Sequence, residues 1–181
     1  MKKRTHFALS RHLLKDTNND LSKVDSMLFC FGSIFPDMTP LCLLHPHKFN
    51  ITDKASKKRL NKVLFGEHNH FANSFRLGCV SHHLADYFTA PHNRTGVKGF
   101  CMDHRGYEMK FDAFFKNKLE NLNTEEMKND IESREFWQHV NRCHEEYMDA
   151  NESFTNDYSY IIEMISNLFF LSQKKRQFCA A

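Results

Sequence analysis

The feature that most constrains the fold is a repeated spacing between an imidazole and an acid. His82 and Asp86 are four residues apart, and His104 and Glu108 repeat this spacing on the next apolar stretch. Residues four apart lie on the same face of a helix, one turn from each other. Each pair therefore converges only if it sits on a helix. Zinc takes imidazole nitrogen and carboxylate oxygen as ligands, so the sequence predicts a zinc site between two helices.

His92 lies between the two pairs and adds a third imidazole. Pro91 precedes it, and because proline cannot continue a helix interior, we expect Pro91 to close the helix that carries Asp86. His92 would then stand at the end of that helix, with its ring turned back toward His82. Ionisable groups on apolar helices are costly to bury unless they pair or bind a metal. Their concentration here favours a metal site over separate hydrogen-bonded pairs.

Helical periodicity extends along most of the chain, and no segment has the alternation of a convincing strand. We expect a first helix from His6, and a second helix that follows Asp20 and ends at Gly32. The apolar, inward side of that second helix is expected to consist of Val24, Met27, Leu28 and Phe31. Two prolines in the segment 34–40 disfavour helix, so Asp37 is expected on a rigid, extended loop.

The central helix, about 70–90, is the most apolar and is expected to be the buried one. Gly78 lacks a side chain one turn before His82, which would allow another helix or a metal to approach closely. Further helices are expected over 103–119, 123–150 and 157–176, and the apolar side of the last consists of Tyr158, Ile161, Ile162, Ile165, Leu168 and Phe169. The start of the second of these is indicated by a capping box of Asn123 and Glu126. The sequence thus predicts an all-α fold.

Composition allows this interpretation without adding a function. A chain of 181 residues is expected to form one domain, residues 1–181, around a single core. The 41% hydrophobic and 26% charged fractions are ordinary for a globular protein, whereas 12 histidines are unusual. The formal charge of +3 is too small and too scattered to indicate nucleic-acid binding by itself.

The start of the chain does not resemble a secretory signal. Its apolar residues are interrupted by His6, Ser10, Arg11 and His12. No apolar run approaches the roughly 20 residues that a bilayer core requires. The six cysteines show no CxxC pair and no compact framework, which is typical of reduced thiols. We therefore expect a cytoplasmic protein without a transmembrane segment, or a mature form whose signal has been removed.

Several motifs together support a family resemblance. The segment 82–108 contains HxxxD, then APH, then HxxxE, and GSIFPDMTP surrounds Asp37. Near the N-terminus, THFALSRHLL places His6 at the start of an amphipathic run. These segments resemble the zinc-dependent phospholipase C family, whose fold is shared by the S1/P1 nucleases, and the resemblance covers the chain up to about Phe115. It implies a single-domain, multi-helix bundle of the phospholipase C / P1 nuclease type.

The resemblance also implies ligands for two zinc ions and leaves a third site open. It assigns Asp37, His47, His82 and Asp86 to the first ion, His92, His104 and Glu108 to the second, and His6 with Asp86 to the third. His45, His68 or His70 could take the place of His47, and His6 could equally be a core histidine. Secreted members of the family also use the N-terminal amine at the third site. Only five residues precede His6 here, which leaves that site in question.

The function implied is phosphodiester hydrolysis by a zinc-activated water, with phospholipid head groups as the leading substrate and Asp37 orienting or deprotonating the water. One alternative is a nuclease of the S1/P1 kind, which would act on single-stranded nucleic acid. The other is a non-catalytic protein in which zinc only holds the helices together.

Overall fold

The computed structural model describes residues 1–16, 21–39, 48–66, 69–93, 104–123, 129 and 131–180, and these are almost entirely helical. The elements are α1 (Lys3–Asp16), α2 (Lys23–Ile34), the short 3-10 helix η1 (Pro36–Met38), α4 (Phe49–Phe65), α5 (His70–Tyr87), α6 (Ala90–Asn93), α7 (His104–Leu119), α8 (Phe136–Asp149) and α9 (Phe154–Ala180). No strand occurs within these ranges. The predicted all-α fold is confirmed for the described part of the chain.

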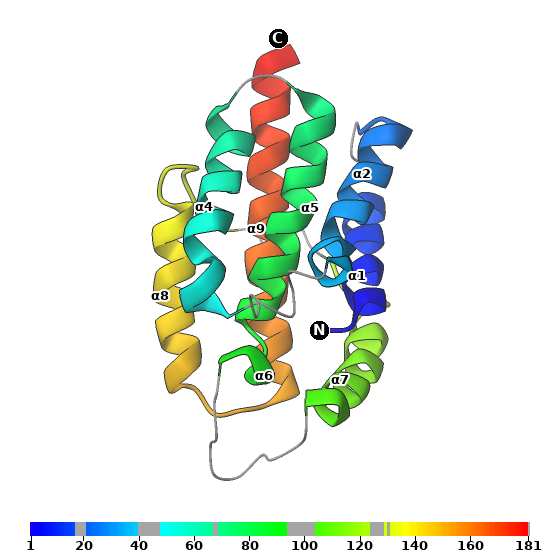
Figure 1. Cartoon of the computed structure of the whole chain (residues 1–181), viewed down its shortest axis with the longest axis vertical. Coiled ribbons are helices and arrows are strands. Elements are labelled where there is room, and N and C mark those ends of the chain that lie inside the picture. The colour runs from blue at the N-terminus through cyan, green and yellow to red at the C-terminus, as the bar shows by residue number, and fades with distance from the viewer. Residues whose placement is uncertain are drawn as a thin grey trace.

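Two long helices, α5 and α9, run through the middle of the bundle (Figure 1). α4 and α8 cover one side, and α1 and α2 cover the other. The predicted inward side of α9 is confirmed, because Ile161, Ile165 and Leu168 are fully buried. The N-terminus of the chain lies within the bundle, close to the start of α7 (Figure 1). None of the helices, over the residues described, is long and apolar enough to cross a membrane.

A pair of glycines sets the close approach of α2 to α5. A Cβ atom on Gly78 would lie 2.2 Å from the carbonyl oxygen of Phe29 and 2.7 Å from the nitrogen of Ser33. A Cβ on Gly32 would lie 2.2 Å from the carbonyl oxygen of Phe75. Side chains at these positions would force the helices apart. The prediction that Gly78 allows a close approach is therefore correct, and the approaching element is a helix.

This glycine contact overturns the predicted orientation of α2. Val24, Met27 and Phe31, expected to face inward, are 51%, 72% and 43% exposed. The buried residues of α2 are Asp25, Phe29, Cys30, Gly32 and Ser33. The glycine pair determines which face meets α5, and the buried Asp25 carboxylate is stabilised by hydrogen bonds from the hydroxyls of Ser22 and Ser74. The pattern of apolar residues alone therefore indicated the wrong face of α2 as the buried one.

The expected ends of several elements also need correction. α2 continues past Gly32 to Ile34, and the segment after it forms η1 instead of running extended. Proline is tolerated in the first turn of a helix, so Pro36 opens η1 without disrupting it. α5 ends at Tyr87, before Pro91, which lies inside the short helix α6. The helix expected from residue 123 begins only at Phe136; the cap residue Glu126 lies outside the described residues.

Candidate metal centre

The carboxylate of Asp86, on α5, is the point where four other groups meet. It is fully buried. Its Oδ1 atom lies 2.6 Å from the amine nitrogen of Met1 and 3.2 Å from Nε2 of His6. Its Oδ2 atom lies 3.2 Å from Nε2 of His82 and 3.4 Å from Nδ1 of His92. The two oxygens thus face two different sets of nitrogen atoms.

Two further acids stand at the edge of this group and are partly exposed. Asp37, on η1, is 21% exposed, and its Oδ1 lies 3.6 Å from Nε2 of His82. Glu108, on α7, is 19% exposed, and its Oε1 lies 3.6 Å from the Met1 amine. Atoms of His6, Asp37 and His82 suited to metal binding all lie within 4.8 Å of one another. The structure therefore brings five helical elements, α1, η1, α5, α6 and α7, to one cluster.

Local hydrogen bonds hold the contributing elements in place. The hydroxyl of Thr5, next to His6, donates to Oδ1 of Asp112 at 2.7 Å and so ties α1 to α7. At the end of α5, the hydroxyl of Thr89 donates to the carbonyl oxygen of Asp86 at 2.9 Å. Asn93 on α6 then donates to the Thr89 carbonyl at 3.0 Å, which fixes the turn that carries His92.

α8 supports this turn from the outside of the bundle. His144 lies 2.8 Å through its Nε2 from Oδ1 of Asn93, and its ring stacks on Phe49 at 3.9 Å between centroids. Burial lowers the pKa of His144 to about 4. The ring is therefore neutral at physiological pH, and its Nε2–H donates to the Asn93 side chain. His144 is thus a packing residue that positions α6.

The hydrogen bond of His82 determines the state of its ring. Nδ1 of His82 lies 2.9 Å from the carbonyl oxygen of Ser33, and a carbonyl can only accept, so Nδ1 carries the proton. In the neutral ring, Nε2 then presents a lone pair to the carboxylates of Asp86 and Asp37. Oxygen and nitrogen lone pairs repel at this range unless a proton or a metal ion lies between them. An outer hydrogen bond of this kind is also typical of histidines that bind metals.

The charges around Asp86 suit a cation as well. Burial raises the pKa of Asp86, but His92, the Met1 amine, His6 and His82 outweigh it and hold the pKa well below its usual value. Burial, together with the nearby His82, lowers the pKa of His6 well below its usual value. Asp86 is thus an anion and His6 a neutral ring. Those are the protonation states in which the two side chains bind zinc.

The spacing of these atoms fits tetrahedral coordination. Zinc bonds of about 2.0–2.1 Å to nitrogen and oxygen separate neighbouring ligand atoms by about 3.3 Å. The separations from Asp86 to His6 and to His82 are both 3.2 Å, and that from Asp37 to His82 is 3.6 Å. In addition, Nε2 of His6 is buried and makes no hydrogen bond of good geometry. The residues present therefore fit zinc.

Of the ligands expected from the sequence, six lie in the cluster: His6, Asp37, His82, Asp86, His92 and Glu108. His47, and its alternatives His45 and His68, lie outside the described residues, as does the side chain of His104. His70 is described, at the start of α5. The helical rise puts it about 18 Å from His82, so His70 is not a ligand of this cluster.

The Met1 amine is the group that sequence reasoning left in question. Burial lowers its pKa, but Asp86, Glu108 and Asp37 outweigh burial and raise it above the usual value. α1 starts at Lys3, so Met1 lies little more than one helical turn from His6 and reaches the same carboxylate oxygen.

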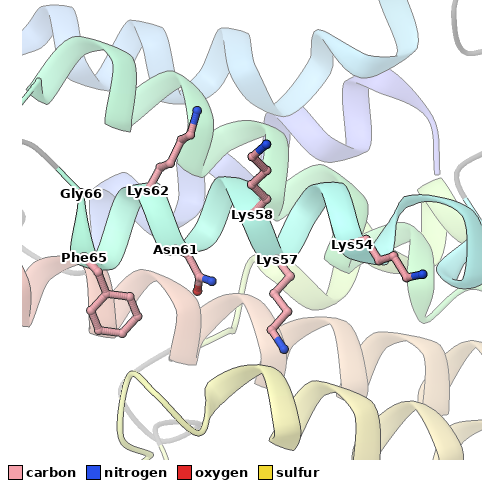
Figure 2. Close-up of a pocket in the computed structure, with 7 residues that line it drawn as sticks. All are labelled: Lys54, Lys57, Lys58, Asn61, Lys62, Phe65 and Gly66. Atoms are coloured by element: carbon pink, nitrogen blue, oxygen red, sulfur yellow. The ribbon is translucent and has the colours of Figure 1, made fainter.

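Two hollows among the described residues lie elsewhere. One, of about 440 Å³, runs along the outer face of α4 (Figure 2). Figure 2 shows its lysines extending away from α4 in different directions. A second, of about 460 Å³, lies between α4 and α5 and includes Arg59 and Arg76. Neither contains a residue of the Asp86 cluster, so the two hollows do not belong to the candidate metal centre.

Comparison with known families agrees with this geometry. The family model described as zinc dependent phospholipase C matches residues 5–170, which is most of the chain. Neither the curated proteins nor the solved structures gave a match. The matched span includes every described residue of the cluster except Met1. The chain, with its all-helical fold and its buried carboxylate surrounded by imidazoles, belongs to the zinc-dependent phospholipase C family.

Proposed function

We propose that this protein is a zinc-dependent phosphodiesterase that cleaves phospholipid head groups in the manner of a phospholipase C. The observation that carries the proposal is the environment of Asp86. One carboxylate oxygen faces His6 and the Met1 amine, and the other faces His82 and His92. A carboxylate used from both sides is suited to bridge two metal ions, as a multi-zinc hydrolase requires.

The ligand sets follow from these positions and from the family resemblance. The first ion would be held by Asp37, His82, Asp86 and, from outside the described residues, His47. The second would be held by His92, Glu108 and His104. The third would be held by His6, Asp86 and the Met1 amine. The contact between the amine and Asp86 favours the third set, which the sequence alone left open.

The chemistry of the site divides between zinc and the residues around it. Bound zinc supplies an acidified water at neutral pH and neutralises charge on the phosphoryl oxygens. Asp37 is the most exposed acid of the cluster, and we assign to it the orientation and deprotonation of the attacking water. His82 is held by the Ser33 carbonyl and keeps its ligand atom aimed at the centre.

The overall reaction is an ordinary hydrolysis. The water oxygen bonds to phosphorus, and the bond from phosphorus to the glycerol oxygen breaks. Diacylglycerol leaves with a proton, and the phosphorylated alcohol is the second product. Placing the reacting phosphoryl group against fixed positive charge is the largest contribution that such a site makes to the rate.

The proposal is tested with zinc-loaded protein on vesicles of several phospholipids and on a soluble phosphodiester, with diacylglycerol release as the readout. The double variant His82→Ala/His92→Ala should lose turnover of both kinds of substrate. His83→Ala is the matched control, since His83 is buried on the same helix but bonds to Ser56 outside the cluster. Undiminished hydrolysis by the double variant would refute the proposal.

Two further outcomes separate the alternatives. Hydrolysis of single-stranded DNA without phospholipid turnover would assign the site to a nuclease. Stoichiometric zinc binding without turnover of any phosphodiester would assign the metal a structural role.

A further inference from the structure

Outside the Asp86 cluster, α8 and α9 bring together three side chains of metal-binding type. His139 and Cys143 lie four residues apart on α8, and Glu163 faces them from α9. Their ligand atoms all lie within 4.8 Å of one another. The spacing of His139 and Cys143 is that of a ligand pair on one helix face, and Glu163 adds a third group from the next helix along the chain.

The distances fit a tetrahedral metal site. Bonds of about 2.3 Å from zinc to sulfur and about 2.0–2.1 Å to nitrogen or oxygen place sulfur and nitrogen ligands about 3.5 Å apart, and nitrogen and oxygen ligands about 3.3 Å apart. Sγ of Cys143 lies 3.6 Å from Nε2 of His139. Nε2 of His139 lies 3.1 Å from Oε1 of Glu163. Little movement is needed to place one ion among the three atoms.

The burial of the site would hold the ligands and admit an ion. Cys143 is only 4% exposed, whereas His139 and Glu163 are 12% and 30% exposed at their side chains. The thiol thus forms the floor of the cluster, and the carboxylate forms its open edge. Asn129 donates to Oε1 of Glu163 at 3.0 Å and so orients the carboxylate from outside, as a supporting group does in metal sites.

The electrostatic surroundings favour a cation. Burial, with Glu163 and Glu146 nearby, raises the pKa of the Cys143 thiol to about 11. A divalent ion among these groups would neutralise the negative charge of the Glu163 and Glu146 carboxylates. A coordinating thiol loses its proton to solvent when the metal binds.

We propose that His139, Cys143 and Glu163 form a separate zinc site that joins α8 to α9. A soft thiolate with an imidazole and a carboxylate selects zinc over calcium or magnesium. Three protein ligands leave the fourth position to water. The site does not depend on the phospholipase activity, and its role is to fix α8 against the bundle.

One neighbouring side chain gives the proposal a distinctive consequence. Arg142, which is exposed, donates to Nδ1 of His139 at 2.9 Å. Metal binding through Nε2 requires a proton on Nδ1, so Arg142 has to turn away when the metal binds. Arg142→Ala should therefore bind metal severalfold more tightly than the wild type. If the three residues formed only a hydrogen-bonded network, removal of Arg142 would bring no gain in metal affinity.

The experiment is a titration of the full-length protein with Co²⁺, followed by near-ultraviolet absorption. Only a thiolate ligand gives an intense sulfur-to-cobalt charge-transfer band, whereas the described groups around Asp86 offer nitrogen and oxygen. The wild type should show this band rise to the intensity of one thiolate-bound cobalt per chain, while the Asp86 cluster takes up further Co²⁺ without adding to the band, and excess Zn²⁺ should abolish it. Cys143→Ser should lose the band. Cys79→Ser is the matched control, because Cys79 is equally buried and its pKa is also raised to about 11. This variant should keep the band, since Cys79 lies on α5 and is not one of the three proposed ligands.

A second variant separates coordination from folding. Glu163→Gln keeps the size of the side chain and an oxygen that accepts from His139, but removes the charge. It should weaken Co²⁺ binding at this site by at least about tenfold, while its Tm in EDTA stays close to that of the wild type. The proposal is overturned if the wild type gives no band, if Cys143→Ser retains it, or if Glu163→Gln binds Co²⁺ as the wild type does.

Discussion

Replacement of Gly78 by Ala should disturb the Asp86 cluster through α2, although Gly78 has no side chain that could contact the ligands. The new Cβ would lie 2.2 Å from the carbonyl oxygen of Phe29, whereas real Cβ atoms keep at least 3.0 Å from such neighbours. The contact is with backbone, so α2 as a whole has to move by about 0.8 Å. Overpacking of this kind costs about 1–3 kcal/mol, and the better helix propensity of Ala offsets about 1 kcal/mol.

The same displacement reaches the metal site through a single hydrogen bond. Ser33, on α2, holds Nδ1 of His82 at 2.9 Å, and a shift of about 0.8 Å along that direction leaves hydrogen-bond range. Loss of an outer-shell partner of a metal-binding histidine weakens metal affinity by about 10–100-fold. We therefore expect Gly78→Ala to bind zinc at least tenfold more weakly, in chelator competition, and to be up to about 2 kcal/mol less stable in urea with EDTA.

A matched control distinguishes this mechanism from general destabilisation. Val80→Ala removes two methyl groups from a fully buried position on α5 and costs about 2 kcal/mol without pushing on Ser33. Its zinc affinity should match that of the wild type. Equal losses of zinc affinity in both variants, or wild-type affinity in Gly78→Ala, would refute the argument that the glycine contact positions His82.

Three other changes test the site and its surroundings. Asp86→Asn removes the negative charge that the imidazoles surround. It should lower the zinc stoichiometry found by metal analysis, and it should lower the rate of phosphodiester hydrolysis by at least about 100-fold. Removal of zinc by EDTA should lower Tm by about 10 °C, because a ligand at about 1,000 times its Kd stabilises the folded state by about 4 kcal/mol. An unchanged Tm in calorimetry would argue against bound metal. Burial raises the pKa of Asp157 from 3.8 to about 6, so stability from its neutral form is present below pH 3.8 and is lost as the pH rises through 6. Relative to Asp157→Asn, the wild-type free energy of unfolding in EDTA should fall by up to about 3 kcal/mol across that interval, and parallel urea curves for the two proteins would contradict this expectation.

Local spacing predicted the helices and the proximity of His82 to Asp86, because both are local properties. An imidazole and an acid four residues apart share a helix face whatever the rest of the chain does, and His82 and Asp86 do lie 3.2 Å apart. The buried side of α9 was also predicted, since its apolar residues repeat at helical spacing. The spacing did not predict which helix faces meet. On α2, Met27 is exposed and Asp25 is buried, against the apolar pattern.

The orientation of α2 depends on contacts that a hydrophobic pattern does not record. Gly32 and Gly78 have no side chains to contribute to such a pattern, yet their mutual approach decides the face. The cost of burying the Asp25 carboxylate is offset by two hydroxyl donors, one of them from α5. Small and polar residues can therefore form the closest helix contact in a bundle, while apolar residues of the same helix face solvent.

The most consequential contacts of the metal centre are those made by groups without a side-chain signature. Ser33 acts through its backbone carbonyl, and Met1 acts through its amine, so neither residue type indicates its role. Both become visible only when the fold places them against His82 and Asp86. The sequence nevertheless contains their cause, because Gly78 lies one turn before His82 and admits α2 closely enough for a main-chain oxygen to reach the imidazole. The position of the ligand is thus set by a glycine one turn away, which is why the glycine is the informative residue to mutate.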